Sequence, residues 1–289
     1  MKFGTLENPV DVDFALPPDA AGTAKALASR NGKGLKIYVG CSKWGKNELQ
    51  GFYPRGVKNE LAYYSTQFNS IELNALAYGR KPKEVIKGWY ESTPPDFRFF
   101  SKFSQSISHY RRLNNTEEFV ENFVSSLSEL NEKLGGLFLQ MSANFAPKDI
   151  ARIFRFVEFW RWEIPLYVEF RHTDWYNEPA IAAQIYSLFE EAEVSTVITD
   201  TAARRDLIHM RLTTPRAFVR FVGNNHPTDF ERLDAWVERI AMWKQLGLEE
   251  LAFFVHQNFE KKPALLATYL IERLNAKIGA TLNIPIPQE

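Results

Sequence analysis

The sequence has almost no cysteine and no excess of charge of either sign. Its only cysteine is Cys41, so no disulfide can form within the chain and the fold must be held by burial. The 35 lysines and arginines balance 35 aspartates and glutamates, which leaves no global field to attract DNA or an acidic membrane. The charge balance argues against a protein that coats nucleic acid, and the lack of a disulfide suits a reducing cytoplasm.

Long apolar runs and the common cofactor motifs are also missing. No stretch approaches the roughly 20 apolar residues that span a bilayer. The first residues, MKFGTLENPVDVDF, carry acids and a proline where a secretory signal needs an apolar run. No P-loop, G-x-G-x-x-G, H-E-x-x-H or paired C-x-x-C occurs. We expect a cytoplasmic protein with no membrane partner and without the commonest nucleotide and zinc motifs.

The chain is rich in material for a core, and its organisation changes near residue 36. Hydrophobic residues make up 45% of the sequence and aromatic residues 14%, which is ample for a large folded domain. Prolines and glycines punctuate residues 1–35, which hold one short helical candidate at 23–29. We predict that residues 1–35 are an N-terminal extension, laid over the main domain or partly mobile, and that 36–289 form one domain.

Eight short runs of β-branched and aromatic residues predict eight strands. Most are almost continuously hydrophobic, as in strands that are buried on both faces of a parallel sheet. Alternation with helical segments favours a parallel α/β fold, and a count of eight favours a closed (β/α)8 barrel of the TIM type. The predicted strands cover residues 37–39, 70–73, 98–103, 137–139, 166–170, 196–199, 217–221 and 251–255.

The segments between the strands have recognisable helix ends. Thr116 is a candidate N-cap for a helix that Gly135 would end. Thr228 and Glu231 match a capping box, and Gly247 is a candidate stop for that helix. The last helix is predicted from Pro263 to Gly279. Residues 202–215 show no clean amphipathic pattern, so the crossover between the sixth and seventh strands is expected to be short or irregular.

Polar side chains stand at the C-terminal ends of most predicted strands. Reacting groups of such barrels lie at these ends and on the loops that follow, a region that we call the barrel mouth. Glu169 and Arg171 share strand parity, so both are predicted to face the mouth, with Phe170 facing the helices. The other polar residues at strand ends are Glu72, Asn74, Lys102, Gln140, Asp200, Arg220 and His256.

A structural role is the alternative for each of these residues. Glu169 and Arg171 could be an ion pair that stabilises the barrel. His256 could be a structural histidine whose ring nitrogens are hydrogen-bonded within the protein. Taken as a set, the residues favour a functional pocket. Loops add His109, His172, and the aromatic side chains Trp44 and Trp175, which suit stacking on a sugar or base but also suit packing. Backbone amides of residues 223–225 could form an anion-binding nest.

The motifs that carry these residues resemble those of the YecE-like family, domain-of-unknown-function family seventy-two, which is described as related to sugar isomerases. The resemblance covers about residues 37–278 and leaves out the first 35. The matching motifs are Val39-Gly40-Cys41-Ser42 with Trp44, Phe52-Tyr53-Pro54, Ile71-Glu72-Leu73-Asn74 with Tyr78, Lys102 with Ile107-Ser108-His109, Leu139-Gln140, Val168-Glu169-Phe170-Arg171-His172 with Trp175, Asp200, and Val219-Arg220-Phe221 with Gly223.

The resemblance implies a TIM-type barrel with its marker residues around the mouth, and it implies no established reaction. This chain departs from the pattern at three places. Val222 stands where relatives tend to have histidine, the tryptophan expected shortly before Phe52 is absent, and His256-Gln257-Asn258 replaces an aromatic residue followed by asparagines. The resemblance therefore does not carry over an identical substrate.

Three functions remain open at the level of sequence. The first is an enzyme, an isomerase or a hydrolase, that acts on a small anionic or sugar-like substrate by acid/base chemistry. The second is a non-catalytic binding or sensor module for a sugar phosphate or nucleotide. The third is a nucleic-acid-processing enzyme related to barrel endonucleases, which the neutral charge disfavours. The oligomeric state stays open.

If the protein is such an acid/base enzyme, the residue types indicate the role of each candidate. Acid/base candidates are Glu72 and Glu169, with Asp200 or His256 as partner. Lysine and arginine in the same mouth would repel a cation, so we expect no tightly held metal and no other cofactor, with a divalent metal as the open alternative. The predicted substrate-binding residues are Trp44, Asn74, Lys102, His109, Gln140, Arg171, His172, Trp175 and Arg220.

Overall fold

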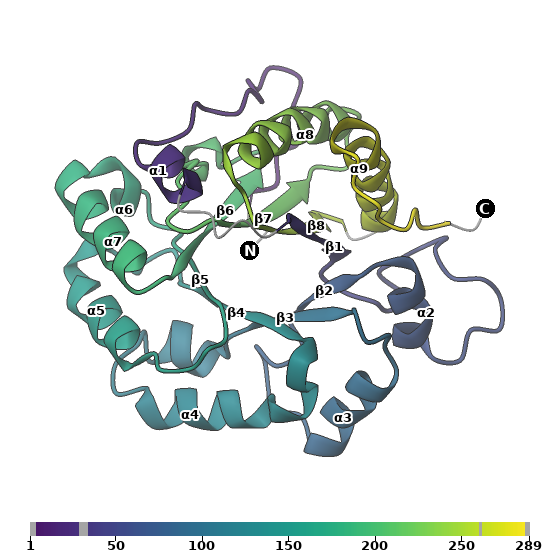
Figure 1. Cartoon of the computed structure of the whole chain (residues 1–289), viewed down its shortest axis with the longest axis horizontal. Helices are drawn as coiled ribbons and strands as arrows, with labels where there is room; N and C mark the ends of the chain where they lie inside the picture. The colour runs from purple at the N-terminus through teal and green to yellow at the C-terminus, as the bar shows by residue number, and fades with distance from the viewer. Residues whose placement is uncertain (1–3, 29–33, 260–261, 287–289) are drawn as a thin grey trace.

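A ring of eight parallel strands forms the centre of the molecule (Figure 1). The computed structural model describes residues 4–28, 34–259 and 262–286. The strands are hydrogen-bonded in the order β1-β8-β7-β6-β5-β4-β3-β2, and every pair is parallel, so the predicted (β/α)8 barrel is confirmed. They are β1 (Lys36–Cys41), β2 (Ser70–Leu73), β3 (Arg98–Lys102), β4 (Leu134–Gln140), β5 (Leu166–Glu169), β6 (Ser195–Thr201), β7 (Arg216–Gly223) and β8 (Glu250–Gln257).

Helices surround this ring and cover its outer face (Figure 1). The helices bear apolar residues on their buried sides, as expected for helices that cover a parallel sheet. The α-helices are α1 (Thr23–Ala28), α2 (Glu60–Gln67), α3 (Lys83–Glu91), α4 (Glu117–Ser126), α5 (Ile150–Phe159), α6 (Asp174–Asn177), α7 (Pro179–Glu191), α8 (Thr228–Leu246) and α9 (Pro263–Ile278). Short 3-10 or π segments are η1 (Ser106–Tyr110), η2 (Ser128–Lys133), η3 (Pro147–Asp149) and η4 (Arg205–Leu207).

Side chains bridge the seam between β1 and β2, in place of a strand ladder. The Asn69 amide donates to the Ile37 carbonyl at 2.7 Å and accepts from the Val39 amide at 3.0 Å. The approach is so close that a Cβ on Gly40 would lie 2.0 Å from the Ser70 carbonyl oxygen. Glycine is therefore required at position 40 for the barrel to close.

Apolar side chains pack on both faces of the strands. The larger core lies between the strands and the helices. A smaller, mostly aromatic core fills the inside of the barrel, which is therefore solid and not a pore. This interior core consists of Phe100, Phe138, Tyr167, Val197, Phe218, Ala252 and Phe254. It forms the floor beneath the polar residues of the mouth.

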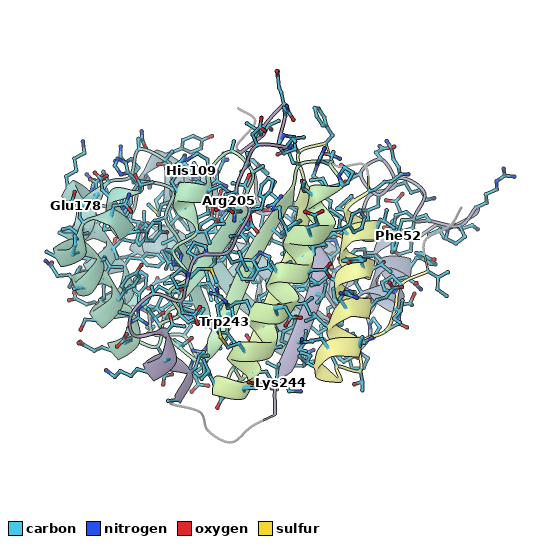
Figure 2. All side chains as sticks on the ribbon, turned by 90° about the horizontal axis from the view of Figure 1, so that it is seen from above. Phe52, His109, Glu178, Arg205, Trp243 and Lys244 are labelled. Atoms are coloured by element: carbon cyan, nitrogen blue, oxygen red, sulfur yellow. The ribbon has the colours of Figure 1, made fainter. Side chains whose placement is uncertain are left out.

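The N-terminal extension lies against β6, α8 and their loops. Figure 2 shows it passing Arg205 along the side of the barrel. Asp19 accepts hydrogen bonds from Arg239 at 2.5 Å and from the Trp243 indole at 2.9 Å, and the Gly4 carbonyl accepts from Thr201 at 3.0 Å. The short predicted helix is α1, although Ser29 at its predicted end lies outside the described residues.

Two predicted helix signals are wrong. The helix after Thr116 ends at Ser126, and Gly135 already belongs to β4, because the chain passes through η2 before the strand begins. Thr228 is the first residue of α8 and forms no capping box. Asp229 instead binds the preceding loop, since its carboxylate accepts the backbone amides of Asn224 at 2.9 Å and of His226 at 3.3 Å.

Other sequence signals agree with the structure. Gly247 and Gly279 follow α8 and α9 in the left-handed conformation that favours glycine. The crossover between β6 and β7 contains only the three-residue η4 as helical structure, as its weak pattern predicted. No helix in the described part of the chain is both long and apolar enough to cross a membrane.

Candidate functional site at the barrel mouth

Eight of the predicted site residues form one hydrogen-bonded cluster at the C-terminal ends of the strands. Strand alternation explains how they meet: Phe100, Phe138 and Phe218 fill the barrel interior, so the residues two positions further along, Lys102, Gln140 and Arg220, face inward one layer nearer the mouth. We call this set the mouth cluster. Its members are Glu72, Asn74, Lys102, Gln140, Glu169, Arg171, Arg220 and His256.

Arg220 joins the two buried carboxylates. Its Nε and Nη2 donate to the two oxygens of Glu72 at 2.8 and 2.9 Å, which is bidentate geometry. Its Nη1 donates to Oε2 of Glu169 at 2.9 Å. The guanidinium carbon lies 5.5 Å from the centre of the Phe138 ring, directly above the aromatic floor. All three nitrogens of Arg220 are therefore engaged by the chain itself.

Each carboxylate has further partners. Asn74 donates to Oε1 of Glu72 at 2.9 Å, and Nε2 of His256 lies 2.9 Å from Oε2 of Glu72. Burial opposes ionisation of Glu72, but the Arg220 guanidinium and His256 hold the pKa of this carboxyl well below its usual value. Glu72 is thus an anion at neutral pH.

Glu169 is held in the same way on the opposite side. Gln140 donates to its Oε2 at 2.7 Å, and Arg171 donates to its Oε1 at 2.9 Å. Burial works against the charged form, yet the neighbouring Arg220 and Arg171 lower the pKa of Glu169 to about 2. The shared parity of Glu169 and Arg171 is confirmed, and Phe170 faces the helices, where its ring stacks 4.3 Å from that of Trp175.

Lys102 differs from the other cations of the mouth cluster. Its Nζ donates to Oε1 of Gln140 at 2.7 Å, and no carboxylate of the described residues lies within 4.0 Å of it. Its side chain is only 6% exposed. Burial, together with the positive charge of Arg220, lowers the pKa of Lys102 to about 8. A buried ammonium with one neutral partner is an incompletely satisfied charge.

The mouth cluster carries more positive than negative charge. Lys102, Arg171 and Arg220 face only two carboxylates, Glu72 and Glu169, so the cluster has one surplus positive charge when Lys102 is protonated. His109 borders it: the pKa of this half-buried imidazole is lowered by burial and then by the charges of Lys102 and Arg171. The electrostatic balance of the mouth cluster is therefore positive.

The donor set does not resemble that of a metal site. Among the residues that the structure describes, no three histidine, cysteine or acidic side chains are grouped as metal ligands would be. The space between Glu72 and Glu169 is filled by the Arg220 guanidinium, which occupies the carboxylate oxygens that a cation would need.

Asp200 does not belong to this cluster, although it stands at the end of β6. Val197 faces the barrel interior, so the alternation of the strand turns Asp200 outward toward α8. There it accepts hydrogen bonds from Arg232 and the Trp236 indole, both at 2.7 Å, and pairs with Arg205. The expectation that Asp200 would assist catalysis at the mouth is therefore not supported by its position.

The two tryptophans also pack away from the mouth cluster. The Trp175 ring is fully buried between Phe145 and Phe170, and its indole donates to the Phe145 carbonyl at 2.7 Å. Trp44 packs edge-on against Trp89, with ring centres 5.7 Å apart. Both fit the packing alternative for these aromatic residues.

The remaining predicted groups lie at the edge of the mouth or are otherwise engaged. His172 lies beside Asp174, with its Nδ1 3.6 Å from the carboxylate. The anion nest expected after β7 is occupied by the chain itself, because the Asn224 amide donates to the Asp229 carboxylate. Sequence reasoning missed one inward residue of β6, Thr199, which lies beside Arg220 in register.

The fold and this site define a (β/α)8-barrel protein with a buried ionic cluster at the C-terminal end of its strands. The chain belongs to the family described as "Protein of unknown function DUF72", whose model matches residues 38–289. The predicted resemblance is thus confirmed, and the N-terminal extension, with the first two residues of β1, lies outside the match.

Curated relatives and solved structures agree with this assignment. The chain is 28% identical to the UPF0759 protein YecE of Escherichia coli K12 in an alignment of 274 residues that covers 86% of this chain and 97% of the relative. It is 25% identical to the UPF0759 protein YunF of Bacillus subtilis in an alignment of 201 residues that covers 65% of this chain and 71% of the relative.

Crystal structures of two family members share the fold. A DUF72 family protein from Thermotoga maritima has a TM-score of 0.66 at 24% identity, covering 83% of this chain and 99% of the neighbour. One from Enterococcus faecalis has a TM-score of 0.66 at 20% identity, covering 85% and 98%. At these identities the likeness shows the fold alone.

Proposed function

We propose that the protein is an enzyme that binds a small anionic or sugar-like substrate at the barrel mouth and transforms it by acid/base chemistry. One observation carries the proposal. Lys102 is a buried ammonium whose only hydrogen bond within the described chain goes to a neutral amide, in a cluster with surplus positive charge. Such an arrangement is costly unless an anion completes it, and barrels of this type carry their active sites at this end.

The hydrogen bonds divide the roles among the cations. Arg220 spends its three nitrogens on Glu72 and Glu169, so it positions those carboxylates. Lys102 has donors left for a ligand, and Arg171 is partly exposed at the mouth. We therefore assign the anion-holding role to Lys102 and Arg171, with His109 beside them.

Proton transfer falls to groups whose pKa lies near neutrality. A carboxylate with a pKa of about 2, as in Glu169, is a weak base, whereas Lys102 with a pKa of about 8 exchanges its proton readily. We assign the proton-transfer role to Lys102, with Glu169 as the fixed charge that orients the substrate. The kinship with sugar isomerases that the family resemblance implies fits this chemistry and stays part of the proposal.

A non-catalytic sensor is the second candidate, and one observation favours it. Every carboxylate oxygen of Glu72 and Glu169 already accepts a hydrogen bond from the protein. A site so fully engaged binds a ligand well without providing a strong base.

A ligand screen tests the proposal. Sugar phosphates, sugar acids, nucleotides, inorganic phosphate and divalent cations are added singly, and the melting temperature is followed. We expect anions to raise it and divalent cations alone to leave it unchanged. Stabilisation by a divalent cation alone, or by no anion, would contradict the proposal.

Two variants define the site and separate enzyme from sensor. Lys102→Met should abolish the rise in melting temperature that anions cause. The substitution itself should raise the free energy of unfolding by about 1–3 kcal/mol, because it removes a buried charge that has a single, neutral hydrogen-bond partner. The exposed Lys87→Met is the matched control and should retain binding. Any stabilising ligand is then incubated with the protein and followed by NMR. A new product that Lys102→Met does not form supports the enzyme; binding without conversion supports the sensor.

A further inference from the structure

Thr199 is an inward-facing residue of β6 at the level of the mouth cluster. Val197 belongs to the interior core, and strand alternation points Thr199 to the same side, one layer nearer the mouth. It is paired in register with Arg220 on β7, while β5, on the other side of β6, carries Glu169. Thr199 therefore lines the same space as the buried charges.

The hydroxyl of Thr199 has no hydrogen-bond partner among the described residues, although the side chain is only 3% exposed. The other hydroxyl residues of the strand are different: Ser195, Thr196 and Thr201 each hydrogen-bond within the protein. A buried hydroxyl without a partner is destabilising, and valine fits a strand equally well. The strand thus carries a destabilising group at one position, and that position faces the mouth.

The chemistry of the neighbours indicates what this hydroxyl binds. Lys102 and Arg171 can only donate hydrogen bonds, and the oxygens of Glu72 and Glu169 are already engaged by the chain. Thr199 is therefore an inward oxygen that is still able to accept a hydrogen bond from a ligand hydroxyl.

We propose that Thr199 hydrogen-bonds a hydroxyl group of the ligand and so selects a hydroxyl-bearing anion over an anion without hydroxyls. This inference rests on the proposed anion-binding function and narrows its substrate class. The shared chemistry is a hydroxylated carbon chain that ends in phosphate or carboxylate, and sugar phosphates and sugar acids are its two sources.

Matched probes and two variants test the inference by calorimetric titration. Ribose 5-phosphate and gluconate are the hydroxylated anions; inorganic phosphate and hexanoate are their counterparts without a carbon-borne hydroxyl. In Thr199→Val we expect about tenfold weaker binding of the hydroxylated probe that the wild type binds, unchanged binding of its counterpart, and a melting temperature that is unchanged or higher. Thr199→Ser, which keeps the hydroxyl, should restore the affinity. If Thr199→Val loses affinity only for ribose 5-phosphate, the anionic group of the ligand is a phosphate. If it loses affinity only for gluconate, that group is a carboxylate.

Three results would overturn the inference. A melting temperature several degrees lower in Thr199→Val would show that the hydroxyl supports the fold. Equal affinity of wild type and Thr199→Val for the hydroxylated probes would remove Thr199 from the ligand contacts while leaving anion binding intact. Failure of the wild type to bind any probe would contradict the proposed function itself, together with this inference.

Discussion

Lys102 is the residue on which the proposed function depends most. Its ammonium is buried beside Arg220 and Arg171, and its single hydrogen bond goes to Gln140. Evolution usually pairs such a charge or replaces it with an apolar side chain, because an unpaired buried charge lowers stability. The proposed ligand binding accounts for such a charge at the C-terminal end of a barrel strand.

The pH dependence of binding follows from this residue. The pKa of Lys102 is about 8, lowered from its usual value, so the free protein loses this charge as the pH rises through 8. We expect the affinity for any anion identified in the screen to be roughly tenfold lower at pH 9.5 than at pH 7. Titrations at several pH values measure it, with the exposed Lys87→Met as a control that should follow the wild-type pH profile. A flat wild-type profile would separate Lys102 from the ligand.

Arg220 neutralises the buried carboxylates Glu72 and Glu169, and unfolding measurements can test this structural role. Arg220→Met leaves Glu72 and Glu169 buried without their main partner, which should cost about 3–5 kcal/mol at pH 7. Without the guanidinium the pKa values of both carboxyls rise, so both take up protons as the pH falls, and the loss should shrink toward pH 5. Urea unfolding at the two pH values measures this loss.

The control and the contrary outcome for Arg220 are simple. Arg273→Met, at an exposed ion pair with Asp234, should change stability by less than about 0.5 kcal/mol at either pH. An equal loss at pH 5 and pH 7 in Arg220→Met would show that packing against Phe138, and not charge, is what the variant removes.

At the scale of elements, the N-terminus of α8 shows how a local sequence signal is overridden. The pattern at 228–231 predicts a capping box, but Pro227 precedes the helix and Asp229 turns back to the loop after β7. Its carboxylate accepts the Asn224 amide at 2.9 Å and pairs with Arg232 at 3.0 Å. This tertiary arrangement satisfies the loop and the helix end together.

Two substitutions distinguish these interpretations. Asp229→Ala should lower the free energy of unfolding by about 2 kcal/mol, because it leaves the buried Arg232 short of a partner. Thr228→Ala should change it by less than about 0.5 kcal/mol, since its side chain caps no backbone amide of α8. Chemical denaturation of both variants measures the difference. A larger loss of unfolding free energy in Thr228→Ala than in Asp229→Ala would support the predicted capping box.

The sequence predicts the strands, and the face on which each side chain lies, better than it predicts the hydrogen-bond partners of those side chains. Alternation that continues from the end of β5 correctly separates Glu169 and Arg171 from Phe170, because a side-chain period of two is a property of extended backbone itself. The same rule, applied to β6 from Val197, would have turned Asp200 outward and Thr199 inward. Position at a strand end does not reveal which way a side chain faces.

Partners across the barrel are set by tertiary structure. Nothing in the local sequence links Arg220 to Glu72, which lies 148 positions away, or Lys102 to Gln140. The polarity of these residues and their places at strand ends indicate a site. Only the assembled barrel shows that Arg220 uses all its nitrogens in hydrogen bonds within the protein, whereas Lys102 makes one hydrogen bond.

At the scale of the whole molecule, the barrel is layered along its axis. Aromatic side chains fill the middle, and the ionic mouth cluster lies above them, so its charges sit on an apolar floor and interact strongly. Figure 2 shows His109 and Arg205 toward the mouth end and Lys244 toward the opposite end. The N-terminal extension, outside the family match, joins this scaffold through β6 and α8.

A crystal structure of the protein soaked with the anion that most raises its melting temperature tests the central claim most directly. We expect ligand density at the barrel mouth, with an anionic oxygen within hydrogen-bonding distance of the Lys102 Nζ and with Arg220 still bound to Glu72 and Glu169. Density bound elsewhere on the molecule, with Lys102 bonded only to Gln140, would contradict it.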